Sequence, residues 1–198
     1  MTATLSHLGL PGDETAWAAL GFTIVSGTIR IGQVVCTVGE HPSWAFADTH
    51  ADQSILAVPA PSTSPADLPA DAGVHPNGIT KIDHVVYEVA DLDASVEALT
   101  AVLGTPPRKR FHPRGPEGPE MAFYRAGEAV IEVVASGKPP HLLGLAFRSP
   151  DLDATVAAVR TAGAPIGDPK PSVQGGRIAS IWSGYVNWGL AVMESAPR

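Results

Sequence analysis

The chain has 198 residues, of which 44% are hydrophobic, and it carries a formal net charge of −7 at pH 7 with an isoelectric point near 5.4. This length suffices to bury a sizeable core, while the acidity excludes the basic footprint of a nucleic-acid-binding protein. A single cysteine excludes an internal disulfide, and the longest apolar runs are too short to cross a bilayer. We therefore expect a cytoplasmic protein with no nucleic-acid and no membrane partner.

Residues 1–58 are predicted to form a degenerate αβββ unit that lacks a leading strand. Residues 14–20 have the pattern of a short helix that ends at Gly21, and strand patterns follow at residues 22–25, 28–38 and 55–58. The alternative is a divergent N-terminal subdomain that covers the sheet formed by the rest of the chain.

Residues 59–78, PAPSTSPADLPADAGVHPNG, form a proline-rich linker. This stretch has no apolar periodicity, so it cannot bury enough surface to offset the entropy of ordering itself. We expect an extended connector and a domain boundary near residue 78.

Residues 79–138 are predicted to form the first of two βαβββ modules. The β-branched run 79–89 has the composition of a buried strand, and Asp91 stands at the N-cap of a helix that Gly104 ends. A basic, proline-rich segment follows at 106–113, and further strands are predicted at 121–125 and 129–134.

Residues 139–198 repeat this plan. The hexapeptide DLDASV at 91–96 returns as DLDATV at 151–156, each preceded by an apolar run and followed by a helical pattern. Such a duplication indicates two copies of one supersecondary unit packed side by side. The second copy has a strand at 142–147, a helix at 151–162, and strands near 178–182 and 189–193. The predicted fold class is therefore α+β, with paired βαβββ modules.

The two copies differ in one chemically important position. His84 precedes the first DLD motif, and Gly144 occupies the corresponding position before the second. A ligand or base that is present in one half is therefore absent from the other.

The segments IDHVVYEVADLDASVEAL, AVIEVV and GLAFRSPDLDATVAAV resemble the paired modules of the vicinal oxygen chelate superfamily, also called the glyoxalase/bleomycin resistance/dioxygenase superfamily. The resemblance covers roughly residues 79–195. Within the superfamily, the chain is similar to glyoxalase-like domain proteins that share the HPNG-IDHVV opening and a Gln-x-Gly-Arg segment, here Gln174 to Arg177.

The resemblance implies a cup in which each module contributes a His from its opening strand and a Glu from its last strand to a divalent metal. His84 and Glu132 fit the first half, whereas Gly144 takes the histidine position of the second. Aligning GEAVIE with GLAVME places Glu194 opposite Glu132, but the usual family spacing points to Met193. Because strand neighbours face opposite sides, this register decides which side chain enters the cup.

The predicted metal ligands are accordingly His84, Glu132 and Glu194, with Zn, Fe, Mn or Ni as the candidate cofactor and a metal-free site as the alternative. His84, Glu132 and Arg177 are the candidate catalytic residues, Arg177 as a clamp for a substrate carboxylate or carbonyl. The basic group around Arg108–Arg110, with His112 and Arg114, is either a solvated loop or an attractor for an anionic ligand at the mouth of the cup.

Three functions agree with these features. The first is a metal-dependent lyase, isomerase or dioxygenase, and the second is a metal-free enzyme in which His84 is a general base. The third is a protein that sequesters an apolar or aromatic compound, as the drug-resistance branch of the superfamily does. In each case the partner is a small molecule, and the protein is a monomer or a homodimer.

Overall fold

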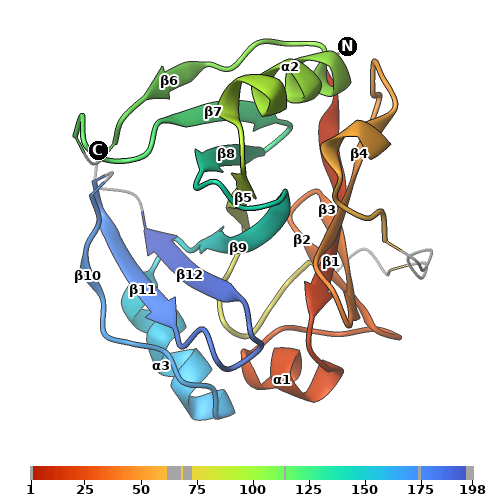
Figure 1. The fold of residues 1–198 in the computed structure, drawn as a ribbon. Helices are drawn as coiled ribbons and strands as arrows, with labels where there is room; N and C mark the ends of the chain where they lie inside the picture. Colours follow the sequence, from red (N-terminus) through yellow and green to blue (C-terminus); the bar gives the residue numbers. More distant parts are fainter. Residues whose placement is uncertain (1, 62–67, 69–72, 114, 174, 195–198) are drawn as a thin grey trace.

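A computed structural model of the chain describes residues 2–61, 68, 73–113, 115–173 and 175–194. Arg114 and Gln174, both singled out by the sequence, lie outside the described residues. The chain forms two sheets: a four-stranded sheet of order β2-β3-β1-β4 and an eight-stranded sheet of order β10-β11-β12-β9-β5-β8-β7-β6 (Figure 1). Within the described ranges, no helix is both long and apolar enough to span a membrane.

The eight-stranded sheet contains the two predicted βαβββ modules. The first consists of β5 (Lys81–Val89), α2 (Leu92–Leu103), β6 (Lys109–Phe111), β7 (Met121–Ala126) and β8 (Ala129–Ala135). The second consists of β9 (His141–Arg148), α3 (Leu152–Ala162), β10 (Lys170–Pro171), β11 (Arg177–Ile181) and β12 (Gly189–Glu194). In each module the first strand pairs in parallel with the last, and β5 pairs antiparallel with β9 where the modules meet. The predicted fold class is confirmed.

The repeated DLD motif begins both module helices, as predicted. The carboxylate of Asp91 accepts from the backbone N of Ala94 at 3.0 Å, and that of Asp151 accepts from Ala154 N at 2.9 Å. Both helices end at a glycine in the left-handed conformation that L-residues avoid, Gly104 and Gly163. The two helices lie on the outside of the curved eight-stranded sheet, whose edge strands β6 and β10 come round to the same side (Figure 1). The inner face of the sheet thereby forms a cup.

The N-terminal unit differs from the prediction at its start, at residues 22–25 and at its end. It contains β1 (Thr4–Pro11), α1 (Glu14–Ala19), β2 (Thr28–Ile31), β3 (Val34–Gly39), β4 (Ser43–Ala47) and the 3₁₀ turn η1 (Gln53–Leu56). A leading strand is therefore present, and residues 22–25 contribute only an isolated bridge at Val25. Of the strand predicted at 55–58, residues 55 and 56 belong to the short turn and the rest is neither helix nor strand. The sequence TLSHLGLP mixes polar residues and glycine with leucine, so its strand character depends on pairing with β3 and β4.

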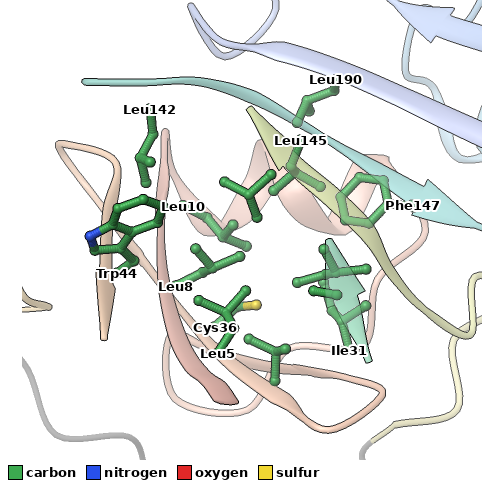
Figure 2. Close-up of a cluster of buried hydrophobic side chains, with 14 of the residues drawn as sticks. Leu5, Leu8, Leu10, Ile31, Cys36, Trp44, Leu142, Leu145, Phe147 and Leu190 are labelled. Carbon is green, nitrogen blue, oxygen red and sulfur yellow. The ribbon is translucent and has the colours of Figure 1, made fainter. Parts of the chain in front are cut away.

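The N-terminal sheet covers the outer face of β9 and its neighbours. Side chains of β1, β2 and β3 meet side chains of β9 and β12 in one buried cluster, which Figure 2 shows with Leu8, Leu10, Ile31, Cys36, Leu145, Phe147 and Leu190 among its members. All of these side chains are almost completely buried. The same residues of β9 that turn away from the cup thus hold the N-terminal sheet in place, so the described chain shares one continuous core.

The end of the linker is anchored at His75 and Asn77. Asn77 Nδ2 donates to Leu20 O at 2.9 Å, and its Oδ1 accepts from Ile79 N at 3.0 Å. His75 Nδ1 accepts from Thr23 N at 3.2 Å, and its Nε2 donates to the backbone oxygen of Arg30 at 2.8 Å. These contacts fix the point at which the chain enters β5.

Candidate functional site

A β-bulge in β5 shapes the candidate site. Ile82 pairs with Phe147 and His84 pairs with Ala146, so Asp83 is an extra residue on β5. A bulge re-aims the side chains at its position, and here Asp83 and His84, although neighbours in the chain, point toward each other. His84 Nδ1 donates to Asp83 Oδ2 at 3.0 Å.

Arg148 of β9 fixes Asp83 from the other side. Its Nε donates to Asp83 Oδ1 at 3.0 Å, and its Nη2 contacts the same oxygen. Desolvation raises the pKa of Asp83, but the hydrogen bonds and positive charges of His84 and Arg148 outweigh it and hold that pKa below its ordinary value. Asp83 is therefore an ionised acceptor, and in neutral His84 the proton belongs on Nδ1.

Glu132 of β8 completes the polar group. It pairs with Val86 in the parallel register of β5 and β8, and its Oε1 lies 3.8 Å from His84 Nδ1. Its side chain is only 9% exposed and that of His84 13%. Two carboxylates thus lie near Nδ1 of the imidazole. Nε2 has no hydrogen-bond or ion-pair partner in the described part of the chain.

These residues lie in a cavity of about 500 Å³ on the inner face of the first module. The wall consists of residues from β5 to β8, including Phe123 and Arg125, together with the segment before β6 that contains Arg108. Val173, in the turn between β10 and β11, borders the cavity from the second module. The predicted pair of His84 and Glu132 is therefore brought together, and it lies in a cavity of a size that admits a small molecule.

The strand register shows why the second module has no equivalent group. In the first module, His84 pairs with Val130; at the same place in the second module, Gly144 pairs with Gly189. Two residues further along the strands, Glu132 lies opposite Val86 in the first module, and Ala191 lies opposite Ala146 in the second. The counterparts of the two polar residues are therefore Gly144 and Ala191. A Cβ atom at Gly144 would overlap the carbonyl oxygen of Gly189 and lie 2.8 Å from its carbonyl carbon.

Glu194 and Arg177 lie together at the start of α3. Glu194 Oε1 accepts from Leu152 N at 3.1 Å, and its Oε2 accepts from Arg177 Nε at 2.8 Å. Arg177 also reaches Asp153 at 2.9 Å. Met193, by strand alternation, points to the opposite face of β12 and is buried. The structure does not bring Glu194 or Arg177 to the cavity that holds His84.

The donor set at His84 does not match a divalent metal site. Among the described residues, no three His, Cys, Asp or Glu side chains are arranged to hold a metal ion. Asp83, the third acidic or imidazole group beside His84 and Glu132, is already bound by the guanidinium of Arg148. The second module contributes Gly144 and Ala191, neither of which supplies a ligand.

Sequence reasoning missed Asp83 and Arg148. Arg148 occupies the position in the second repeat that Glu88 occupies in the first. The repeat therefore allowed the prediction of a charged side chain on the inner face at this position. The pairing of Arg148 with Asp83 was not predictable, because that contact depends on the bulge and on the antiparallel register of β5 and β9.

The family sequence model of the Glyoxalase/Bleomycin resistance protein/Dioxygenase superfamily matches residues 81–186 of this chain. The chain therefore belongs to this superfamily. The fold is similar to that of methylmalonyl-CoA epimerase from Mycobacterium tuberculosis, with 24% identity and a TM-score of 0.51 over 61% of this chain and 91% of that one. A methylmalonyl-CoA epimerase from Streptomyces coelicolor, in complex with 2-nitronate-propionyl-CoA, gives 21% identity and a TM-score of 0.48 over 60% and 99% of the two chains. No curated protein matches the chain.

Proposed function

We propose that the protein is a metal-independent enzyme that transfers a proton at the carbon next to a carbonyl group of a small molecule, as an isomerase or a lyase does. The observation that carries this proposal is the 3.0 Å hydrogen bond from His84 Nδ1 to Asp83, which leaves Nε2 as a basic nitrogen within the cavity. A histidine oriented in this way by a carboxylate is an effective general base near neutral pH.

The surrounding groups support this role for His84. Asp83, itself fixed by Arg148, sets the tautomer and stabilises the imidazolium that forms when Nε2 accepts a proton. Glu132, 3.8 Å from Nδ1, adds a second negative charge on the same side of the ring. Arg125 lies in the same cross-strand row as Val130 and His84 and lines the cavity. We assign to it the stabilisation of the negative charge that develops on the carbonyl oxygen.

The fold is compatible with this class of reaction, since an epimerase also removes and returns a proton at carbon. Nothing in the cavity of this chain identifies methylmalonyl-CoA as its substrate, so we propose only the class of reaction.

The first experiment needs no substrate. Long-range ¹H–¹⁵N NMR of imidazole-labelled protein should show neutral His84 with its proton on Nδ1, and Asp83→Asn should weaken this preference. A neutral His84 with its proton on Nε2 would contradict the proposal.

The second experiment measures catalysis. Exchange of carbon-bound protons for deuterium, followed by NMR over a panel of carbonyl acids and acyl thioesters, should detect substrates; His84→Gln should lower the rate by about 10²–10⁴-fold, and treatment with a chelator should leave it unchanged. His41→Gln removes an exposed histidine outside the cavity and serves as the control. Exchange that a chelator abolishes and a divalent metal restores would instead support the metal-dependent enzyme.

A binding protein is the second candidate, and one observation favours it. Phe111 and Phe123 stack in the cavity wall with ring centroids 5.2 Å apart and an interplanar angle of 22°, which gives a flat apolar platform. Tight binding of aromatic compounds that is unaffected by His84→Gln, with no exchange across the panel, would support sequestration rather than catalysis.

A further inference from the structure

Three cationic side chains line the cavity without an acidic partner. Arg108, Lys109 and Arg125 all border it, and none forms an ion pair with an acidic side chain in the described part of the chain. In a protein with a net charge of −7, acidic groups outnumber basic ones. This wall of the cavity is therefore positively charged, although the protein as a whole is negatively charged.

The neighbouring residue on the same strand provides a contrast. Arg110 follows Lys109 in β6, but its side chain lies on the other face of the sheet, where it pairs with Asp93 and with Glu120 at 2.8 Å. Where β6 faces away from the cavity, its cation is neutralised by two carboxylates. Where the strand faces the cavity, the positive charge is left for a ligand.

The aromatic platform adjoins these cations directly. Lys109 pairs with Phe123 across β6 and β7, and Phe111, two residues along β6, stacks on Phe123. Phe111 is 44% exposed, and Val173 at the other border of the cavity is 92% exposed. Apolar surface left open beside unpaired cations is typical of a site for a ligand with both an apolar and an anionic part.

We infer that the cavity binds an organic anion, with a carboxylate, sulfonate or phosphate group between Arg108 and Lys109 and an aromatic or flat apolar part on Phe111 and Phe123. The inference deepens the proposed function by naming its substrate class, and it rests on that function only in taking this cavity as the substrate site. Arg108 and Lys109 are both exposed and so mark the mouth of the cavity. An anionic group bound there places the rest of the ligand toward His84.

A matched pair of dyes tests the inference. The anionic 8-anilinonaphthalene-1-sulfonate and the uncharged N-phenyl-1-naphthylamine have similar aromatic parts and differ in the sulfonate. Fluorescence titration should show tighter binding of the anion, and raising the salt concentration from about 0.05 M to about 0.5 M should weaken the anion alone.

Variants locate the two subsites. The double variant Arg108→Gln with Lys109→Gln should weaken binding of the anionic dye about tenfold or more and leave the uncharged dye within about twofold. Phe111→Ser should weaken both dyes. Arg110→Gln, which removes the same kind of charge from the other face of the strand, should change neither. Equal binding of the two dyes, or an effect of Arg110→Gln as large as that of the double variant, would overturn the inference.

His84→Gln separates this inference from the proposed function. It should lower proton exchange by about 10²–10⁴-fold and keep the preference for the anionic dye. In the unsubstituted protein, a preference for the anionic dye without any exchange activity would refute the enzyme alone, whereas exchange activity without any anion preference would refute the anion site alone.

Discussion

Gly144 of β9 lies so close to Gly189 of β12 that no side chain fits between them. Gly144 stands where the first module has His84, and the tight packing of these two strands leaves no room for an imidazole there. The cup is asymmetric for this reason: His84 and Glu132 line the first half, and the small residues Gly144 and Ala191 take the equivalent places in the second.

Gly144→Ala should destabilise the protein by about 3 kcal/mol or more, because its Cβ would overlap backbone atoms that cannot rotate away. Urea denaturation measures the effect. Gly39→Ala is the matched control, since a Cβ at the end of β3 would meet no atom within 4 Å. Gly144→His, which would place an imidazole at the position equivalent to His84, should be destabilised at least as strongly. Normal stability of either Gly144 variant would contradict this account.

Asp83→Asn should lower stability by about 1–2 kcal/mol at neutral pH, because the substitution removes a partly buried charge that accepts from both His84 and Arg148. The pKa of Asp83 is held below its ordinary value of 3.8 in the folded protein. Its stabilising contribution is therefore complete above that pH and is lost as the pH falls through the folded pKa. Denaturation curves of both proteins from neutral pH to below about pH 3 should converge; a difference that stays constant would argue against an ionised Asp83.

His75 should make stability fall on mild acidification. Its Nδ1 accepts from Thr23 N, so protonation would place two donors against each other at that contact. Burial lowers the pKa of His75 below 6.5 and outweighs the opposite effect of its bond to the Arg30 carbonyl. The stability that neutral His75 provides is complete above 6.5 and is lost as the pH falls through the folded pKa.

His75→Gln should therefore lower stability at neutral pH, since the ring that packs on Phe22 is lost, and should flatten the acid dependence. Free energies of unfolding at about pH 7.5 and about pH 5.5 give the comparison, with exposed His41→Gln as the control. An unchanged slope in His75→Gln would contradict the prediction.

Glu194→Ala should lower the melting temperature by roughly 2–4 °C, because the carboxylate accepts from the first turn of α3 and holds Arg177 there. Dye binding in the cavity should not change. Glu97→Ala, on an exposed part of α2, controls for the loss of an acidic residue. Loss of a bound metal or of catalysis in Glu194→Ala would instead support its predicted role as a ligand.

Cys36 should be inert in the folded protein. Its thiol is completely buried between the two sheets, and burial raises its pKa far above the ordinary value (Figure 2). Ellman's reagent should react only in denaturant. Rapid reaction under native conditions would show that the N-terminal sheet separates from β9 and β12.

The paired modules were predictable because local signals agree. The DLD motifs supply an N-cap at the same place in each repeat, the glycines that follow end the helices, and β-branched runs mark the buried strands. The N-terminal strand Thr4–Pro11 was not predictable in this way. Its residues form a strand because β3 and β4 pair with it on either side.

The sequence by itself determined the family and the two βαβββ modules, since both depend on residue types at fixed spacing within a repeat. The expectation that His84 and Glu132 lie together came from the resemblance to the superfamily. Only the tertiary structure decided that Asp83 and Arg148 join His84, and that Ala191 rather than Met193 or Glu194 corresponds to Glu132. Strand register and bulges set these relationships. A shift of one residue between strands reverses which side chains face the cup, and that shift is fixed by packing between distant segments rather than by local composition.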